Sequence, residues 1–549
     1  MINPSECNTI AGSYFDFLAE RFPVMCASDE FHFLPRAENA CNHYDKLDDV
    51  DADAMEETIL ELKAFQSHFS SLTFEDIDLE VYLDLKLLQA NIAGILIELD
   101  TKRVWQYNPL LYLKIAFVGL DHALTKPAAD PREIQERTLA RLSSIPRLLK
   151  QATDNIQSVP DTYHQASVWM VQDCQHYLSE NAEVISELAA NHRKAMLMQV
   201  LENTESALKN FARFLNSLSP QPDRRFAVAT LESSLQDHFL SQRSPQEIFQ
   251  IGVHEWHEIR EQLHMLQSKI DPHTSWQELY HAYSPSQIEE KEIIALYGEE
   301  IDRLRNYFSR LGFNENILST RLEIDYTPKY LASVRSSASF AAAFSQDPRE
   351  RSFFYITTRF PRHNSEKTDD QLQKRLHREY KMLTAHETIP GHHFLDSVRR
   401  SLKRPIRRQI ESPLFYEGWA SYAESLLTEY GYLEDPRELL VDRRRNLWRA
   451  ARCQIDVGLT IGTLTEKDAI DLVTTCGFAP EEASRQLDRF RLNPGYQLCY
   501  CYGSYEFRKL RQSYNDIMGS NEFYNFLLEG GELPFHLTEK RFKHLLPKE

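Results

Sequence analysis

The sequence predicts a mainly α-helical protein with one small β-sheet. Four segments share a helix-start pattern, in which a cap residue with a side-chain oxygen precedes a proline, and an acid or amide lies three residues after the cap. These segments are 130–133, 244–247, 284–287 and 435–438. Only 17 glycines among 549 residues also disfavour a turn-rich β protein.

Hydrophobic periodicity locates the individual elements. Amphipathic patterns predict helices over 76–100, 131–151, 181–217, 286–311 and 369–389. A further helix is expected from Pro413 to about Gly431, with Ser412 as its cap. Two strands are predicted, because residues 321–326 alternate polar and apolar side chains and residues 352–358 are rich in aromatic and β-branched ones.

The order of these elements suggests two parts. Residues 1–315 are predicted to form a mostly helical N-terminal part, and residues 316–549 a C-terminal part that carries the chemistry. The two strands lie just upstream of the helix at 369–389, so a small sheet is expected beside that helix. We do not assume that the two parts fold independently.

Composition limits the classes of partner. The chain is 42% hydrophobic and 26% charged, as expected of a soluble globular protein, and its formal charge is −19. That charge argues against nucleic acid or an anionic membrane as the main partner. No apolar run approaches the roughly 18 residues that span a bilayer, and the first residues do not resemble a secretory signal. Eight scattered cysteines are predicted to be free thiols, which fits a cytoplasmic location.

Residues 386–393 read His-Glu-Thr-Ile-Pro-Gly-His-His. In the familiar His-Glu-x-x-His pattern, histidines four residues apart lie on one helical face and share a metal. Here an ideal helix would turn His392 by about 120° from His386, and would raise His393 by about 10.5 Å. Pro390 and Gly391 break the helix at this point. A kink there could therefore return either His392 or His393 to a metal shared with His386.

A second motif lies on the helix predicted from Pro413. It reads Glu-Gly-Trp-Ala from Glu417, and Glu417, Ser421 and Glu424 fall on one face. Glu417 could supply a third ligand and leave a fourth position for water, while Glu424 could accept a hydrogen bond from a histidine. The two motifs together predict a hydrolytic zinc site. The alternative is a kinked structural helix whose histidines bond only to their neighbours.

Both motifs resemble those of the bacterial family called domain of unknown function 885, a branch of the zincin-like metallopeptidases. That family's pattern is His-Glu-x-x-Pro-Gly-His-His followed by Glu-Gly-Trp-Ala-x-Tyr-x-Glu. The similarity extends from about residue 320 to the end and includes Arg452, Asp456, Gly458, the segment 493–503 and the segment 531–534. The chain departs from the family at Thr460, where many members have histidine, and at Tyr496 and Gln497, which replace a Gln-Ala pair.

The resemblance implies a helical, zincin-like metallopeptidase fold with a deep channel, akin to helical oligopeptidases. In those relatives a glycine directly precedes the second histidine ligand, and Gly391-His392 has this order. The resemblance therefore favours His392 as the ligand and keeps His393 as the alternative. It also singles out Tyr500, which matches a tyrosine of the family pattern, and gives Asp456 a supporting role beside Glu424.

These observations lead to one mechanistic hypothesis. One Zn²⁺ per chain is held by His386, His392 and Glu417, and Glu387 takes a proton from an activated water and passes it to the leaving amine. Tyr500 is the first candidate to stabilise the oxyanion, although a core tyrosine is the alternative.

Arg452 and Arg491 could bind a substrate carboxylate, or could instead pair with Asp456 and Asp488. The expected function is hydrolysis of amide bonds in short peptides or peptide-like molecules. The competing functions are an amidase acting on a non-peptide metabolite and a non-catalytic helical binding protein.

Overall fold

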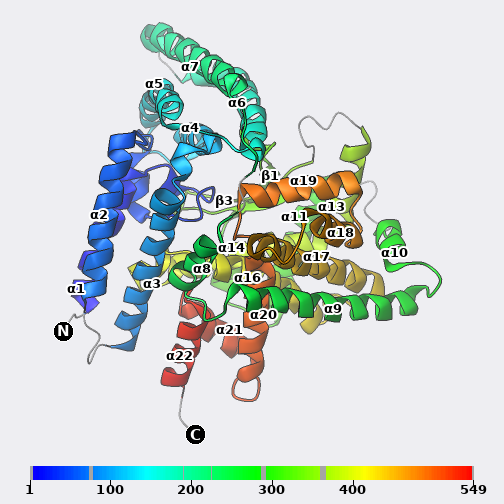
Figure 1. Cartoon of the computed structure of the whole chain (residues 1–549). Coiled ribbons are helices and arrows are strands. Elements are labelled where there is room, and N and C mark those ends of the chain that lie inside the picture. Colours follow the sequence, from blue (N-terminus) through cyan, green and yellow to red (C-terminus); the bar gives the residue numbers. More distant parts are fainter. Residues whose placement is uncertain are drawn as a thin grey trace.

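The protein is mainly helical and contains one three-stranded sheet, so the predicted class is confirmed at that level (Figure 1). The computed structural model describes residues 4–72, 78–188, 191–223, 226–285, 292–358 and 366–546. No helix within these ranges is long and apolar enough to cross a membrane.

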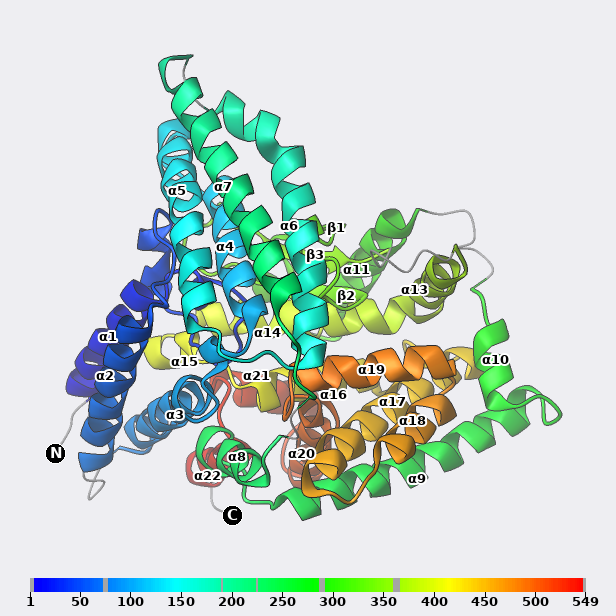
Figure 2. The ribbon, with the colours of Figure 1, turned by 45° about the horizontal axis from the view of Figure 1, so that its top comes forward.

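Helices of the first 217 residues form one layer of the molecule. They are α1 (Pro4–Arg21), α2 (Ala52–Ser71), α3 (Leu79–Leu96), α4 (Pro109–Thr125), α5 (Pro131–Asn155), α6 (Asp161–Glu187) and α7 (Asn191–Ser217). In Figures 1 and 2, α5, α6 and α7 lie side by side and project from the rest of the chain. The apolar cluster of this layer also includes Leu533 and Leu537 from the C-terminal end.

Further helices follow, and most of them contribute to a second large apolar cluster that begins at Leu231. They are α8 (Val228–Ser233), α9 (Pro245–Ile270), α10 (Trp276–Ala282), α11 (Ile293–Arg310), α12 (Glu315–Leu318), α13 (Glu366–Glu387), α14 (His392–Ser401), α15 (Pro405–Gln409), α16 (Pro413–Glu429), α17 (Pro436–Ile461), α18 (Glu466–Thr475), α19 (Pro480–Leu492), α20 (Leu498–Ser513), α21 (Ser520–Glu529) and α22 (Phe535–Leu545). The helix α9 packs along α17, and α16 packs against α20 (Figure 2). Each cluster contains residues from before and from after residue 315. The division into 1–315 and 316–549 therefore stays a prediction.

Most predicted helix starts have the expected cap. The side chains of Asp130, Ser244 and Asp435 accept hydrogen bonds from backbone N–H groups of the first turn, and Ser244 forms a full capping box with Glu247. Ser412 precedes α16 as predicted, but its side chain makes no capping bond. Its backbone N–H instead donates to Glu532 Oε2 at 3.0 Å.

Two helix predictions need correction. The pattern expected to form one helix over 181–217 is divided between α6, which ends at Glu187, and α7, which begins at Asn191. These helices pack against each other, and because both bury an apolar face, the periodicity continues across the connection. The start predicted at 284–287 lies partly outside the described residues, and α11 begins at Ile293.

The sheet has the order β1-β3-β2 and lies beside α13. The predicted strands correspond to β1 (Leu322–Tyr326) and β3 (Ser352–Ile356), which are parallel. The short edge strand β2 (Ala338–Ala341) was not predicted, and it pairs antiparallel with β3, with Phe340 opposite Phe354. Apart from Phe340, its side chains are small and give little strand signal, and pairing with β3 rather than propensity holds it in place.

Candidate metal centre

The end of α13 and the start of α14 bring two histidines together. The helix α13 ends at Glu387, the peptide bond between Ile389 and Pro390 is cis, and α14 begins at His392. Gly391 lies so close to the preceding turn that a Cβ there would be 1.9 Å from the carbonyl oxygen of His386. The break expected at Pro390 and Gly391 therefore separates two helices, and only glycine fits within it.

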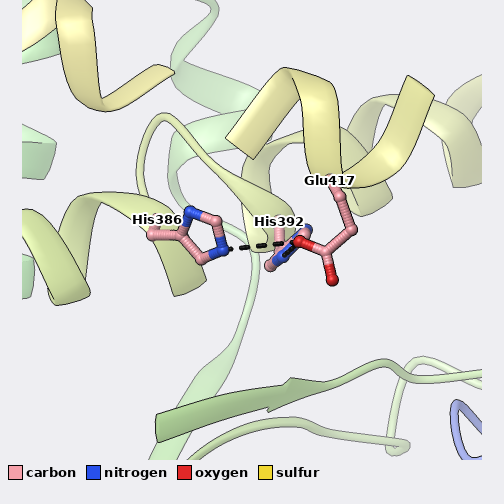
Figure 3. A group of neighbouring side chains, drawn as sticks. All are labelled: His386, His392 and Glu417. Carbon is pink, nitrogen blue, oxygen red and sulfur yellow. Dashed lines mark ion pairs between the residues drawn. The ribbon is translucent and has the colours of Figure 1, made fainter. Parts of the chain in front are cut away.

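The helix α16 supplies the acid. Trp419 Nε1 donates to the carbonyl oxygen of Pro390 at 2.9 Å, which ties α16 to the turn between α13 and α14. One Glu417 oxygen, Oε2, lies 3.5 Å from Nε2 of His386 and 3.5 Å from Nε2 of His392. Figure 3 shows the three side chains converging from separate helical segments.

These three residues form a group whose potential ligand atoms all lie within 4.8 Å of one another, and all three are buried. Tetrahedral ligands with bonds of about 2.0–2.1 Å to zinc are separated by roughly 3.3 Å, which is close to the two distances of 3.5 Å. The Glu417 Oε2 atom is buried without a hydrogen-bond donor among the described residues. The residues present therefore fit a divalent metal ion.

The structure separates His393 from this group. Its Nε2 lies 3.0 Å from Thr320 Oγ1 and 3.3 Å from the Thr320 carbonyl oxygen. Burial, opposed by nearby Asp396, lowers the pKa of His393 to about 4. Of the two alternatives, the geometry thus brings His392 to His386 and Glu417, and directs His393 to Thr320.

Glu424 lies on the other side of His386, as its predicted role requires. Its Oε1 is 3.0 Å from His386 Nδ1. Burial alone would lower the pKa of His386, but the carboxylates of Glu417 and Glu424 beside its two ring nitrogens raise it to about 9. Such a shift shows that the surrounding carboxylates favour a positive charge at this position, whether a proton or a metal ion.

Two arginines of α17 hold Glu424 in place. Arg445 Nη2 donates to Glu424 Oε1 at 2.9 Å, and Arg449 Nη1 donates to Oε2 at 3.0 Å. Neither arginine belongs to a motif that the sequence shows. Their spacing of four residues, which places both on one helical face, was the available signal.

Two tyrosines hold the second oxygen of Glu417. The hydroxyls of Tyr496 and Tyr500 each donate to Glu417 Oε1 at 2.7 Å. Tyr500 thus lies beside the group, as expected of a residue that acts there. Tyr496 was noted only as a departure from the family pattern.

The structure places Asp456 away from the histidines. Its carboxylate accepts backbone N–H groups of Gly495 at 2.8 Å and Leu498 at 3.1 Å. Burial outweighs these bonds and raises the pKa of Asp456 to about 6. Asp456 therefore supports the turn that carries Tyr496 and does not contact the metal-ligand group.

The group opens onto a cavity of about 720 Å³. Residues from both halves of the chain line this cavity, including His32, Tyr107, Glu387 and Phe340. Glu387 accepts no hydrogen bond from any side chain in the described part of the protein. Its carboxylate is thus available to a molecule in the cavity.

Arg452 and Arg491 also line the cavity but differ in their partners. Arg491 pairs with Asp488 at 3.0 Å and with Glu466 at 2.5 Å. Of the two roles expected for Arg491, these contacts favour a structural ion pair over substrate binding. Arg452 does not pair with Asp456. Its Nε donates to Gln497 Oε1 at 3.0 Å, and its guanidinium lies 3.6 Å from the centre of the Tyr500 ring.

The fold and the site define a class of helical protein in which two histidines and a glutamate form a buried candidate metal centre at a cavity wall. The chain belongs to the family described as bacterial protein of unknown function (DUF885), whose family model matches residues 36–541. No curated protein matches the chain.

Two solved structures share the fold. One is a "putative lipoprotein of unknown function" from Shewanella oneidensis, with 16% identity, a TM-score of 0.73 and 100% of each chain covered. The other is a "putative lipoprotein" from Colwellia psychrerythraea, with 17% identity, a TM-score of 0.77 and 99% of each chain covered. At these identities the likeness concerns the fold alone.

Proposed function

We propose that this protein is a zinc-dependent hydrolase of the zincin-like type, which cleaves amide bonds in short peptides or peptide-like molecules. The observation that carries the proposal is the buried group of His386, His392 and Glu417 at the wall of a cavity that Glu387 also lines. Two histidines, one carboxylate and an adjacent free carboxylate are the residue types that hydrolytic zinc sites use.

A zinc ion held by these three residues would supply Lewis acidity, which makes water easier to deprotonate near neutral pH and polarises a carbonyl group. Glu387 would then take the proton of the attacking water and deliver it to the leaving amine. Its position next to His386 in sequence and at the cavity wall supports this role. The lack of a described hydrogen-bond donor leaves both of its oxygens available for that transfer.

The tyrosine hydroxyls would stabilise the negative charge that develops on the substrate oxygen. Tyr500 and Tyr496 place hydroxyl groups at Glu417, and a tyrosine hydroxyl can donate a hydrogen bond to an oxyanion. Tyr500 remains the first candidate. Burial, together with the charge of Glu417, raises the pKa of Tyr500 above its usual value, so it would remain a donor throughout the neutral range.

A peptide-like substrate is favoured by the edge strand. The strand β2 has only β3 as a neighbour in the sheet, and residues 334–340 line the cavity. An edge strand can bind an extended peptide through backbone hydrogen bonds. Phe340 of this strand lies 6.5 Å from the His392 ring, centre to centre, which places the strand beside the candidate centre. The cytoplasmic location stays a prediction.

The proposal is tested by metal analysis combined with a substitution at Glu387. The purified protein should contain about one zinc per chain and should hydrolyse members of a panel of short peptides and acyl-amino acids. Glu387→Gln should keep the zinc and lose about 10²–10⁴-fold in kcat, the usual contribution of general acid–base catalysis.

The control is Glu98→Gln, a cavity-lining glutamate that pairs with Lys102 instead of contacting the histidines. Its activity should stay within a few-fold of the wild type. Full activity of Glu387→Gln with zinc bound would exclude the proposed role of Glu387, and a protein without metal and without amide hydrolysis would exclude the proposed function.

A further inference from the structure

The cavity wall near α17 and α19 is rich in arginine, and most of these side chains have carboxylate partners. Arg445 pairs with Glu379 at 2.7 Å, and Arg335 pairs with Glu30 at 2.6 Å. Arg491 pairs with Glu466 and Asp488. Their charges are thus compensated within the protein.

Arg452 is different. Within the described ranges, no carboxylate oxygen lies within 4.0 Å of its guanidinium, although the side chain is only partly exposed. Its Nε and Nη2 donate to one neutral oxygen, Oε1 of Gln497, at 3.0 Å and 2.5 Å. This pair of nitrogens is an edge at which an arginine binds a carboxylate in bidentate geometry. The amide oxygen of Gln497 thus occupies the position of an anionic partner without supplying its charge.

Arg489 adds a second positive charge to the same wall. It lines the cavity, and its Nη2 donates to the backbone carbonyl oxygen of Arg335 at 3.0 Å. Burial, then the neighbouring charges of Arg375 and Arg452, lower the pKa of Arg489 to about 10. Arg489 and Arg452 thus lie close enough for each charge to act on the other.

The positive charge of Arg452 lies close to the candidate centre. The Arg452 guanidinium is 3.6 Å from the centre of the Tyr500 ring, and the hydroxyl of that tyrosine is 2.7 Å from Glu417 Oε1. The Tyr500 side chain therefore contacts both Arg452 and the metal-ligand group. An anion bound by Arg452 would be a short distance from the bond that is hydrolysed.

We propose that Arg452, with Arg489 beside it, binds a carboxylate of the substrate. The substrate class is then an amide next to a free carboxylate, as in a short peptide cut near its carboxyl end or in an acyl-amino acid. The substrate carboxylate would exchange with, or bind beside, the amide oxygen of Gln497. The cleavage part of this inference rests on the proposed function, whereas the binding part does not.

A purely structural role for Arg452 makes a different prediction. If the guanidinium served only to position the Tyr500 ring, its loss would impair acidic and neutral substrates equally. If it binds a carboxylate, its loss would impair only substrates that carry one. A pair of substrates that differ in this single group therefore distinguishes the two roles.

The test compares benzoyl-glycyl-phenylalanine with its C-terminal carboxamide. The wild type should prefer the acid over the amide in kcat/KM by on the order of 10²-fold, as expected for a charge pair with a partly desolvated arginine. In Arg452→Gln this preference should disappear, with kcat/KM for the carboxamide within a few-fold of the wild type. In Gln497→Glu the arginine and its stacking on Tyr500 remain, but an internal carboxylate occupies the subsite, so the preference should fall as well.

Arg491→Gln is the matched control, because this arginine lines the same cavity but is already neutralised by Glu466 and Asp488. It should keep the preference for the acid. Equal loss of both substrates in Arg452→Gln, or an unchanged preference in Gln497→Glu, would overturn the proposal.

Calorimetric binding to the zinc-loaded Glu387→Gln protein separates this proposal from the proposed function. The acid should bind on the order of 10²-fold more tightly than the carboxamide, and Arg452→Gln introduced into that protein should abolish the difference. This result without any hydrolysis by the wild type would support the subsite and contradict the hydrolase. Equal binding of acid and carboxamide would overturn the subsite even if the wild type hydrolyses both.

Discussion

At the scale of single residues, the candidate centre is a chain of charges. Glu417 and Glu424 flank His386 on its two ring nitrogens, and Arg445 and Arg449 neutralise Glu424 from behind. Burial would raise the pKa values of both glutamates, but the two histidines beside Glu417, and the arginines and His386 beside Glu424, hold them well below the usual range. Both carboxylates are thus ionised at neutral pH, one facing the histidines as a potential ligand and the other orienting the His386 ring.

This arrangement predicts unequal effects of two similar substitutions. Glu424→Gln should weaken zinc binding by about 10–100-fold, the usual effect of removing a partner of a histidine ligand. Glu417→Gln should weaken it further, because it replaces the charged oxygen that faces both histidines. Competition with a fluorescent zinc chelator measures both affinities, and circular dichroism checks that each variant is folded. Equal affinities in the two variants would contradict the assignment of Glu417 as the ligand.

The spacing of residues within one short segment was the informative signal at this scale. Pro390 and Gly391 indicated that the helix breaks, and the break brings His392 back to His386. Tyr496, Arg445 and Arg449 received no role, because each reaches the site from a helix or turn whose position depends on packing. Asp456 was expected beside Glu424 at the ligands, but it binds the backbone of the turn that carries Tyr496, a contact that residue spacing does not indicate.

At the scale of elements, several residues of the two motifs serve to bring helices together. The helices α16 and α20 cross where Gly418 meets Gly503, and a Cβ on Gly418 would lie 2.6 Å from the Gly503 Cα. This crossing places Glu417 of α16 next to Tyr500 of α20. Glycine is needed at the crossing because backbone atoms, unlike the end of a flexible side chain, cannot move aside.

Gly418→Ala should therefore disturb both stability and the site. We expect a loss of about 1–3 kcal/mol in the free energy of unfolding, the usual cost of overpacking, and weaker contact between Tyr500 and Glu417. Denaturant unfolding measures the first effect, and zinc affinity reports on the second. Gly298→Ala is the control, because a Cβ at this helical glycine meets nothing within 4 Å and alanine favours the helix. A Gly418→Ala protein as stable as Gly298→Ala would contradict this account of the crossing.

Element prediction worked where a signal was local and failed where it was not. Helix starts capped by Asp130 and Ser244 depend only on neighbouring residues, and the structure shows the predicted cap hydrogen bonds. The strand β2 has no such signal and depends on its partner β3. The sequence pattern did not reveal that 181–217 is divided between two helices. The two helices pack against each other and both bury an apolar face, so the periodicity does not change between them.

At the scale of the whole molecule, a buried ionic cluster joins the two ends of the chain to the site. Arg36, upstream of α2, pairs with Asp29, Asp396 and Glu411. It also lies 5.7 Å from the centre of the Tyr416 ring, which stacks on His392 at 3.9 Å between ring centres. Arg36, from the N-terminal part of the chain, therefore supports the candidate centre through Tyr416. No local sequence pattern could predict this cluster, because Arg36 lies 360 residues from Asp396 and 375 residues from Glu411.

Glu532 lies next to this cluster and should respond to pH, because Glu411 and Arg36 both act on its charge. Its Oε1 atom lies 3.8 Å from Nε of Arg399, and its Oε2 atom accepts a hydrogen bond from the backbone N–H of Ser412. Burial, reinforced by the negative charge of Glu411, raises the pKa of Glu532 to about 8. Glu532 should therefore carry a proton in the folded protein at neutral pH, whereas a glutamate in the unfolded chain loses its proton near pH 4.5.

Because the folded state holds this proton to higher pH, the stabilising contribution of Glu532 is complete below pH 4.5 and is lost as pH rises through about 8. Glu532→Gln keeps the shape of the protonated side chain and cannot ionise. We therefore expect the free energy of unfolding to fall by about 2–4 kcal/mol more in the wild type than in Glu532→Gln between pH 5 and pH 9. Urea unfolding at both pH values measures this difference, and Glu522→Gln, at an exposed position on α21, should behave like the wild type. Parallel pH profiles for the wild type and Glu532→Gln would show that Glu532 is ionised in the folded protein, and that the cluster holds one more negative charge than we infer.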